Sequence, residues 1–342
     1  MSGQRFRKPY TVPFKPKRRP SPAVKQKLKD IPPTCGIYRF FNREGQILYI
    51  GKAVNLRRRV KQYFGSVAAG WDNRIRSMVP GINDLDWICS DTELEALLLE
   101  DSLIKRYCPD FNTRQKKFLL HAYLSLSNDL FPVFTQKYRS DRTREGTTFG
   151  PLTDGYYARD LLESVNTALG LRRCIDPTPN RRCPHKLGNC LEPCSGLLDP
   201  EDYRKAVDIA KGFLSGRDDD LLGIVAEKMK MYSDRQEYLH AARLRDRLTF
   251  CRRFWKRQHF YHQFIRKRLV IEEKPGRFFL FVRGRYRGCW PSRKELEQAF
   301  VPQEETAEEE SILFDRALVV LAWLNNRKSE KNYLFLPTPY PD

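Results

Sequence analysis

The sequence predicts an α+β fold in which a small domain built on an antiparallel sheet precedes a cysteine-bearing segment and a helical hairpin. Two short runs rich in β-branched and aromatic residues, 35–41 and 46–50, flank the turn Asn42-Arg-Glu-Gly45 and predict a β-hairpin. The segment Thr92-Glu-Leu-Glu95 has the form of a capping box, which predicts the start of a long helix. Between residues 201 and about 264 the chain contains no proline and few glycines, which predicts an antiparallel pair of helices.

The first folded domain is expected to span residues 31–115. After the hairpin, residues 54–64 have the spacing of an amphipathic helix, with Leu56 and Val60 on its inner face. Residues 84–90 predict a third strand, and the helix after Thr92 is expected to end near Cys108, which precedes a proline. Residues 1–30 are expected to form a disordered basic arm, because the first 29 residues contain ten Lys or Arg, five prolines and no acid.

The rest of the chain is predicted to fall into three further regions. Residues 116–200 form a linker region with a four-cysteine cluster, residues 201–265 the helical hairpin, and residues 266–342 a small C-terminal region without an assigned role. The individual elements expected there are a strand at 122–126, a helix at 158–169, a strand at 277–282, an acidic loop at 304–310 and a helix around 317–324.

The charge balance is strongly positive, with 62 Lys and Arg against 42 Asp and Glu, a formal net charge of +20. Such a balance indicates a polyanionic partner, most often nucleic acid, although general solubility is the plain alternative. The apolar and aromatic content is high enough to exclude wholesale disorder. The apolar run 317–324 is far too short to span a membrane, and the basic N-terminus has no signal-peptide character. We therefore expect a cytoplasmic protein without a membrane partner, and no disulfide framework.

Glu100 is the most informative single residue of the first domain. The residues three and four positions away on its predicted helix are Ala96, Leu97, Leu103 and Ile104, so the carboxylate shares a face with apolar side chains. An ionised carboxylate in such surroundings needs a metal ion or a cationic side chain. The alternative, which the pattern favours equally, is a glutamate at the edge of the apolar stripe that reaches out to water.

Tyrosines and cations surround the same part of the domain. Tyr38 and Tyr49 lie on the paired strands, Lys52 follows the second strand, and Arg59 and Tyr63 lie four residues apart on one face of the next helix. Tyrosines beside cations can have lowered phenol pKa values and can accept protons. Spacing alone does not separate this prediction from ordinary aromatic packing in strands.

The motifs of this region resemble the GIY-YIG nuclease family, and within it the UvrC family of excinucleases. Gly36-Ile-Tyr38 and Tyr49-Ile-Gly51 match the two signatures of that family. The resemblance extends over residues 49–64, YIGKAVNLRRRVKQYF, and over Glu95-Ala-Leu-Leu-Leu-Glu100, Leu103-Ile-Lys105 and Pro109-Asp-Phe-Asn112.

The resemblance implies phosphodiester hydrolysis with one divalent metal, Mg²⁺ or Mn²⁺. Glu100 falls at the family's metal-ligand position and Arg59 at the arginine that steadies the phosphate. Tyr38, Tyr49 and Tyr63 fall at its active-site tyrosines, of which Tyr38 is the first choice as general base and Tyr49 the second. Lys52 and Asn112 match supporting positions. The implied reaction is a single incision near a lesion in double-stranded DNA, on the 3′ side by analogy.

Four cysteines lie within 21 residues, with the spacing Cys174-x8-Cys183-x6-Cys190-x3-Cys194. Four thiols so close together suit a tetrahedral zinc or an iron–sulfur cluster, and His185 could compete as a ligand. The spacing does not separate the two. The segment ends in Pro193-Cys-Ser-Gly196 and again resembles UvrC, in which the stretch is associated with a [4Fe–4S] cluster. The resemblance therefore favours [4Fe–4S] over Zn²⁺.

Within the predicted helical hairpin, residues 238–248 alternate small and apolar residues with charged ones at helical spacing. The simplest explanation for 238–248 is a helix that packs within the chain. However, Ala241-Ala-Arg-Leu-Arg-Asp246 resembles the UVR motif, which implies that Ala241, Ala242, Leu244, Arg245 and Asp246 contact a UvrB-like subunit. The resemblance ends near residue 260, and the remaining residues are too few for a second, RNase H-like nuclease domain, as in the short homologue Cho. The competing hypothesis is a non-catalytic adaptor that binds DNA and the UvrB-like subunit.

Overall fold

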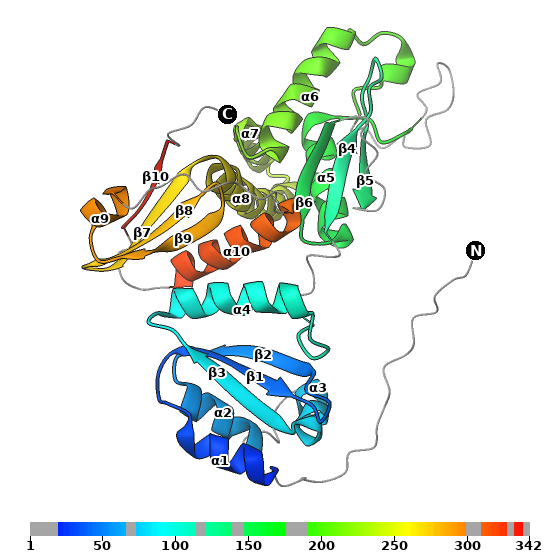
Figure 1. The fold of residues 1–342 in the computed structure, drawn as a ribbon. Coiled ribbons are helices and arrows are strands. Elements are labelled where there is room, and N and C mark those ends of the chain that lie inside the picture. The colour runs from blue at the N-terminus through cyan, green and yellow to red at the C-terminus, as the bar shows by residue number, and fades with distance from the viewer. Residues whose placement is uncertain are drawn as a thin grey trace. The chain divides into compact units, whose positions relative to one another are not determined.

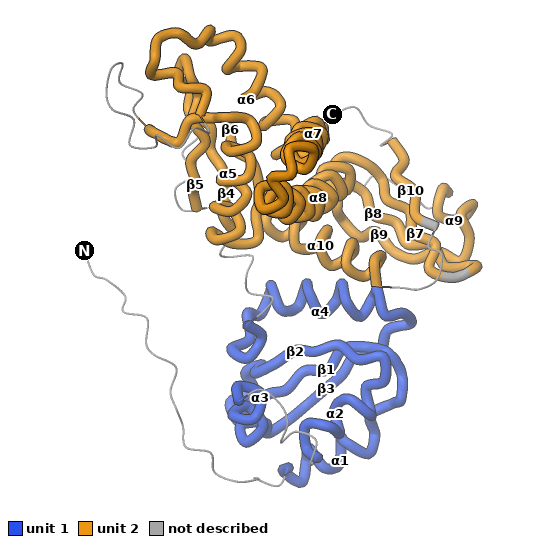
Figure 2. The backbone as a smooth tube through the Cα atoms, turned by 180° about the vertical axis from the view of Figure 1, so that it is seen from behind, with its two compact units in different colours: residues 1–116 blue, residues 117–342 orange. Residues whose placement is uncertain are grey.

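The computed structural model describes residues 20–65, 73–113, 121–138, 147–175, 190–298, 309–326 and 332–337. The chain divides into two compact units, residues 1–116 and 117–342 (Figure 2). We refer to them as unit 1 and unit 2 and describe each by itself.

Unit 1 is built on a three-stranded antiparallel sheet in the order β2-β1-β3, with β1 at Gly36–Phe41, β2 at Ile47–Ala53 and β3 at Asp84–Cys89. Helix α4 (Glu93–Tyr107) packs across β2 and β1 on one side of the sheet. Helices α1 (Pro22–Asp30) and α2 (Leu56–Phe64) lie on the other side (Figure 1). A short helix α3 (Asn73–Met78) and the 3₁₀ turn Val79–Gly81 precede β3. The predicted hairpin, third strand and two helices are therefore confirmed.

The signals that begin and end α4 work as the sequence predicts. The Thr92 hydroxyl accepts a hydrogen bond from the Glu95 amide at 3.1 Å, and the Glu95 carboxylate accepts one from the Asp91 amide at 3.1 Å. At the other end Cys108 adopts a left-handed conformation and its amide donates to the Ile104 carbonyl. This geometry fixes the length of the helix that carries Glu100.

The expectation that residues 1–30 lack regular structure is wrong for 22–30. Ser21 caps α1 by accepting a hydrogen bond from the Val24 amide, and Pro22 occupies the first turn, where its missing N–H costs nothing. The Val24 side chain is completely buried in the core of unit 1. Pro22, which was counted as evidence against regular structure, is therefore the first residue of a helix. Residues 1–19 lie outside the described residues.

Unit 2 begins with a three-stranded antiparallel sheet in the order β5-β4-β6, followed by helices. The strands are β4 (Ala122–Leu126), β5 (Phe134–Tyr138) and β6 (Thr147–Leu152), and the helices are α5 (Gly155–Leu169), α6 (Pro200–Leu214), α7 (Asp220–Asp234) and α8 (Tyr238–Arg266). Helices α7 and α8 form an antiparallel pair (Figure 1). The predicted strand at 122–126 and helix at 158–169 are confirmed.

The expected two-helix hairpin over 201–265 is wrong in one respect, because three helices occupy that range. Gly216 lies between α6 and α7 and interrupts the helical conformation, because its φ is +72°. A Cβ at this position would collide with the backbone of α8 at Gln258 and His259. A single glycine in a helix-rich stretch did not signal this close approach.

A second sheet in unit 2 has the strand order β10-β7-β8-β9. Its strands are β7 (Arg268–Lys274), β8 (Arg277–Val282), β9 (Arg285–Trp290) and β10 (Asn332–Leu336), with α9 (Arg293–Gln298) and α10 (Glu310–Asn326) beside them. Helix α8 connects the two halves of the unit. Its Cys251 and Phe254 belong to the core around α5, α6 and α7, while the ring of its Phe264 lies tilted against Phe281 of β8, with centroids 5.4 Å apart. The predicted strand at 277–282 and the helix around 317–324 are confirmed.

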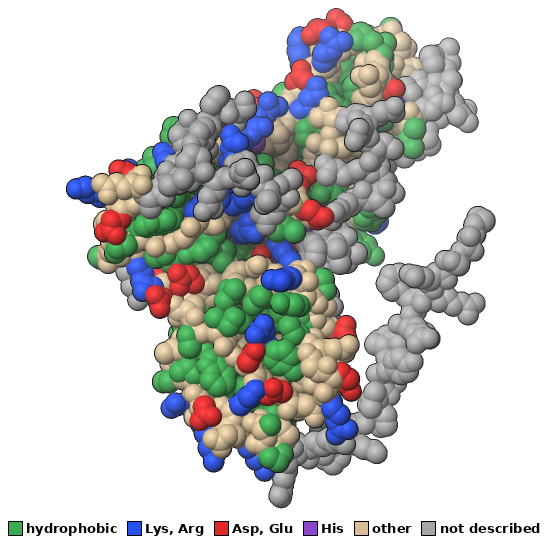
Figure 3. Space-filling model, in the orientation of Figure 1, with side chains coloured by type: hydrophobic (Ala, Val, Ile, Leu, Met, Phe, Trp, Pro, Cys, Tyr) green, Lys and Arg blue, Asp and Glu red, His purple; other side chains and the backbone are tan. Residues whose placement is uncertain are grey.

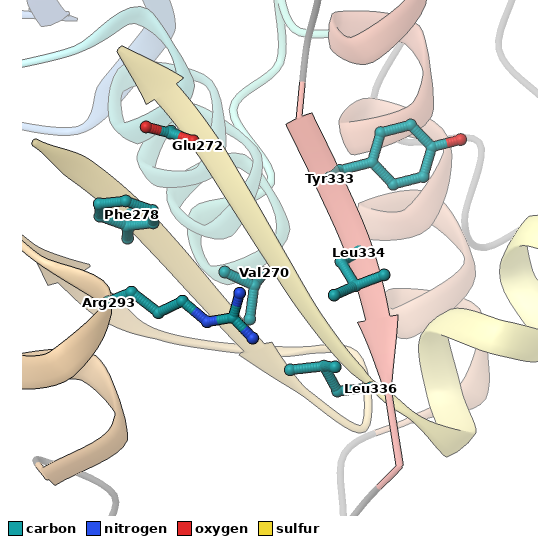
Figure 4. A pocket seen from close by; sticks show the side chains of 7 residues that line it. All are labelled: Val270, Glu272, Phe278, Arg293, Tyr333, Leu334 and Leu336. Atoms are coloured by element: carbon teal, nitrogen blue, oxygen red, sulfur yellow. The ribbon is translucent and has the colours of Figure 1, made fainter. Parts of the chain in front are cut away.

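The face of this second sheet bears a hollow of about 370 Å³. Figure 4 shows the Arg293 side chain reaching across it toward Val270 and Leu336, with Glu272 farther along β7. In the part of the chain that is described, no helix is both long and apolar enough to cross a membrane.

Candidate nuclease site

The two hairpin motifs meet directly across the strand pair. Tyr38 of β1 is the register partner of Gly51 of β2. A Cβ at position 51 would collide with the Tyr38 hydroxyl and lie within 2.9 Å of the Tyr49 ring. Glycine is therefore needed in the second motif because the tyrosine of the first motif lies over it. The geometry gives a physical reason for the pairing of the two motifs.

Three tyrosines cluster at this position. The hydroxyl groups of Tyr38 and Tyr63 are hydrogen-bonded at 2.7 Å, and the ring centroid of Tyr49 lies 6.2 Å from each of the other two rings. Arg59 places its guanidinium 5.5 Å from the centroid of the Tyr63 ring. Tyr38 and Tyr63 are almost fully buried and Tyr49 is half-buried. Of the three, Tyr49 is the most accessible to a ligand.

The expectation of lowered phenol pKa values is wrong for this state of the protein. Burial raises the pKa of Tyr38 well above its usual value of 10, and the neighbouring Tyr63 and Tyr49 raise it further. Burial also raises the pKa of Tyr49, with additional contributions from Tyr63 and from the negative charge of Glu100. The Arg59 charge opposes the rise at both phenols but does not overcome desolvation. Both tyrosines therefore hold their protons near neutral pH.

Glu100 lies on the inner face of α4 and is only 8% exposed. Its Oε1 accepts a hydrogen bond from the backbone amide of Lys52 at 3.1 Å, directly after the second motif. Its contribution to the pKa of Tyr49 places the carboxylate beside the tyrosine cluster. The apolar neighbours at three and four residues thus predicted burial correctly, and the alternative of a glutamate reaching out to water is wrong.

Lys52 and Asn112 support the site from two sides. The Lys52 ammonium binds Glu93 Oε1 at 2.6 Å. Asn112 is buried, and its side chain accepts from the Ile50 amide at 2.9 Å and donates to the Ile50 carbonyl at 2.7 Å. Asn112 therefore fixes the backbone of the second motif rather than reaching a substrate.

Sequence reasoning missed Glu93, the partner of Lys52. It lies seven residues before Glu100, two helical turns away and thus on the same face of α4. This seven-residue spacing is the sequence signal that could have identified Glu93 as a neighbour of the site. Of the residues assigned to the nuclease site, the three tyrosines and Arg59 form one cluster, and Glu100 binds the Lys52 amide.

The residues of this site fit a divalent cation. A partly buried carboxylate offers the hard oxygen that Mg²⁺ prefers, and Mg²⁺ is commonly bound through one or two carboxylates together with waters and substrate phosphates. Among the described residues no group of three or more His, Cys, Asp or Glu side chains is arranged to hold a metal ion. The Glu100 carboxylate is therefore the group of this site whose chemistry fits such an ion.

The cysteine segment is less complete. Cys183 and His185 lie outside the described residues, and Cys174, Cys190 and Cys194 are half-buried and not disulfide-bonded. Burial raises the pKa of the Tyr203 phenol to about 12, and nearby Cys190 and Cys174 raise it further. The Cys190 sulfur accepts a hydrogen bond from the Glu192 amide at 3.4 Å.

A buried arginine, which sequence reasoning passed over, anchors this segment. Arg172 is completely buried and donates to the carbonyls of Phe131, Cys174 and Ile175, and its guanidinium also pairs with Asp129 at 2.8 Å. Its backbone amide donates to the Tyr203 hydroxyl at 3.1 Å. The backbone of Cys174 is thus held in place, which suits a segment that must present a thiol.

The five residues of the predicted partner-binding motif lie in the first two turns of α8. Arg245 and Asp246 are exposed, whereas Ala241, Ala242 and Leu244 are half-buried. Arg245 pairs with Asp246 at 3.2 Å. Leu244 packs against the core of unit 2, in line with the simpler explanation of its periodicity.

Comparison with known proteins matches two ranges of the chain, one with the residues of the nuclease site and one with the cysteine segment. The family described as "UvrC-like GIY-YIG domain" matches residues 34–113, and that described as "UvrC/Cho excinuclease, middle domain" matches residues 121–213. The fold and the site therefore define a GIY-YIG endonuclease domain joined to an excinuclease middle domain. By these two domains the chain belongs to the UvrC/Cho family.

Individual relatives agree with this assignment. The UvrABC system protein C of Caldicellulosiruptor saccharolyticus is 34% identical over 239 residues, which cover 66% of this chain and 39% of that protein. The same protein of Syntrophomonas wolfei is 35% identical over 240 residues, 69% of this chain and 39% of that one. The chain thus matches about two fifths of the length of these relatives.

Solved structures are similar over a shorter range. The GIY-YIG N-terminal endonuclease domain of UvrC from Thermotoga maritima, bound to its catalytic divalent cation magnesium, is 30% identical. It covers 27% of this chain and 99% of its own, with a TM-score of 0.25.

Proposed function

We propose that this chain is a DNA-repair endonuclease of nucleotide excision repair, which hydrolyses one phosphodiester near a lesion, on the 3′ side, with one divalent metal. The observation that carries the proposal is the buried Glu100 carboxylate, which a backbone amide holds beside three clustered tyrosines and Arg59. Asp101 on the same helix is also buried, but as an ion pair with Lys105, whereas the Glu100 carboxylate lies near the Tyr49 phenol.

We assign Glu100 as the ligand of Mg²⁺ or Mn²⁺. When bound, the metal supplies positive charge to the phosphate and to the leaving oxygen. Arg59, half-exposed at the edge of the cluster, binds the phosphate and stabilises the charge that develops on its oxygens. Asn112 and Lys52 keep the second motif in position through the Ile50 backbone and Glu93.

Tyr38 remains our first assignment for the group that takes the proton of the attacking water, and Tyr49 the second. Tyr38 is hydrogen-bonded to Tyr63, which gives its proton a neighbour with which to exchange. Tyr49 is the more accessible phenol. Because burial raises the pKa of both, either role requires positive charge close to the phenol when substrate is bound, and Arg59 is the side chain that contributes it here.

The decisive experiment measures cleavage of a lesion-bearing duplex in the presence of Mg²⁺ and a UvrB-like subunit. We expect a single nick that depends on lesion and partner, and we expect Glu100→Ala to reduce it by at least about 10²-fold while DNA binding persists. Glu95→Gln, on the same helix but engaged in its cap, is the matched control and should cleave like wild type. A folded wild type that binds DNA and the subunit without cutting would establish the adaptor instead.

For the cysteine segment we propose a [4Fe–4S] cluster held by Cys174, Cys183, Cys190 and Cys194. Support comes from three described thiols without disulfides, from the amide that donates to the Cys190 sulfur and from the fixed backbone of Cys174. Protein purified without oxygen should absorb near 400 nm and contain iron. Protein that contains stoichiometric zinc and lacks this absorbance would show that the cysteine segment binds Zn²⁺ instead of the cluster.

For the start of α8 we propose a contact with a UvrB-like subunit. This end of the helix has an accessible surface that combines charged with apolar side chains. The exposed residues are Arg245, Asp246, Tyr238 and Leu239. Asp246→Lys should weaken capture of the subunit, whereas Asp234→Lys at the end of α7 should not. Equal effects of the two variants would contradict the assignment.

A further inference from the structure

The exposed side of α8 beyond its first two turns carries a concentrated positive charge. Arg252, Arg253, Lys256 and Arg257 are all exposed, and we call these four residues the α8 ridge. At 100° per residue they fall on the side of the helix opposite buried Cys251, Phe254 and Gln258. Figure 3 shows further lysine and arginine side chains on the face of unit 2 that is seen in Figure 1.

The charge of the ridge is not neutralised by its surroundings. Within the described ranges, none of the four cations makes an ion pair with an acid. Two exposed cations on α6 differ in this respect, because Arg204 pairs with Glu201 and Lys205 with Asp202 on the same helix. A compact group of unpaired cations costs stability through mutual repulsion unless a polyanion compensates for it.

The first turn of α5 borders the ridge and extends it. The Arg257 guanidinium lies 6.0 Å from the centroid of the Tyr157 ring. Burial raises the pKa of Tyr157, and the charges of Arg257 and Arg253 oppose that rise, so both cations lie near its phenol. On the same turn Tyr156 is 78% exposed, and the guanidinium of Arg159 lies 5.3 Å from the centroid of its ring. The surface thus adds a fifth cation and an exposed aromatic ring.

We infer that the α8 ridge, with the first turn of α5, is a contact surface for the phosphodiester backbone of DNA, separate from the nuclease site of unit 1. The choice of DNA as the polyanion rests on the proposed function. Residues 252–257 span about 7.5 Å along the helix, enough to meet phosphates that follow one another every ~3.4 Å along one strand of a duplex. Exposed arginine and lysine without acidic partners are the side chains that phosphate contacts use. Because such contacts carry no sequence information, the surface adds affinity and positions the duplex.

The test compares two full-length variants that remove the same number of charges. One replaces the ridge, Arg252→Gln/Arg253→Gln/Lys256→Gln/Arg257→Gln. The control replaces four exposed cations on α6, on α7 and just after it, Arg204→Gln/Lys205→Gln/Lys230→Gln/Arg235→Gln. Binding of a fluorescent duplex is measured in EDTA, so that cleavage does not occur, over a series of salt concentrations. Thermal unfolding confirms that both variants are folded.

We expect the ridge variant to bind the duplex about tenfold more weakly at physiological salt, and the slope of log Kd against log salt to fall by about 2 to 4. The control should change neither quantity appreciably. Equal binding by ridge variant and wild type, or an equal loss in the control, would overturn the inference. A ridge variant that keeps DNA binding but loses capture of a UvrB-like subunit would assign the surface to an acidic protein and overturn it as well.

This outcome is independent of the nuclease assignment. Ridge-dependent binding by a wild type that never cleaves would contradict the proposed function and leave the contact surface standing. Lesion-dependent cleavage without any ridge effect on binding would support the proposed function and contradict the contact surface.

Discussion

The nuclease site of unit 1 and the cysteine segment of unit 2 were both predicted from motifs, but they differ in how their residues come together. The first is assembled by the protein alone, because a hairpin, a helix cap and a buried asparagine place tyrosines, arginine and glutamate side by side. The second is held through its backbone at the two described ends of the segment, where Arg172 binds the Cys174 carbonyl and the Leu191 amide donates to the Gly170 carbonyl. A site formed from backbone pairing is complete without its ligand, whereas a site of loop cysteines depends on the ligand to bring its thiols together.

The largest effect that can test this comparison is the removal of the anchor. Arg172→Leu leaves three carbonyls without this donor and removes the ion pair with exposed Asp129, so we expect a loss of about 3 kcal/mol or more in the free energy of unfolding of unit 2. Chemical denaturation followed by circular dichroism measures it. Arg173→Leu is the control, because Arg173 pairs with a half-exposed Glu163 and should cost less than about 1 kcal/mol. Equal losses would mean that Arg172 is not an anchor.

The corresponding anchor of unit 1 is Asn112. Asn112→Ala removes both side-chain hydrogen bonds to Ile50 and leaves that backbone unsatisfied in a buried place, so we expect a loss of about 2 kcal/mol together with weaker cleavage. Asn42→Ala at the exposed hairpin turn also removes a hydrogen bond to a backbone amide, but water replaces it. If the two substitutions cost the same, burial of Asn112 is not what holds the second motif.

A smaller effect is expected where the two motifs touch. Gly51→Ala introduces a Cβ against the Tyr38 hydroxyl, which we expect to destabilise unit 1 by about 1 to 3 kcal/mol and to disturb the tyrosine cluster. Differential scanning calorimetry with a parallel cleavage assay measures both consequences. Gly81→Ala meets only Leu48 at an ordinary 3.6 Å and should be tolerated. An active, stable Gly51→Ala protein would refute the steric reason for the paired motifs.

The smallest effect concerns pH. The pKa values of Tyr38 and Tyr49 are raised in the folded state, so the stabilisation from their protonated forms is complete below pH 10 and is lost as pH rises above it. The double variant Tyr38→Phe/Tyr49→Phe should therefore lose less stability than wild type between neutral and strongly alkaline pH. Denaturant titrations at several pH values measure this difference. A variant with the same alkaline slope as wild type would show that other groups control it.

The sequence predicted the elements that carry the candidate nuclease site, and the burial of Glu100, because their signals are local. The hairpin turn, the capping box and the apolar neighbours of Glu100 all act over a few residues. Features that depend on distant packing were missed. Gly216 contacts the backbone of α8 at residues more than 40 positions later in the chain. Arg172 binds the carbonyl of Phe131, which precedes β5 in the sequence, and that of Cys174, which follows α5. Strands β7, β9 and β10 were not anticipated, because charged or polar residues interrupt their apolar positions and only their pairing into one sheet reveals them.

The local character of the nuclease site has a consequence for biosynthesis. Every hydrogen bond described for the site joins residues between 38 and 112, within a unit that ends at residue 116. At about 5 to 20 residues per second, a ribosome needs roughly 10 to 45 s to add residues 117–342 after unit 1 has been made. The catalytic machinery can thus be in place on a nascent chain before the residues of α8 exist. If the proposed function holds, restraint on cutting during that interval comes from the absence of partner and DNA contacts rather than from an unfinished site.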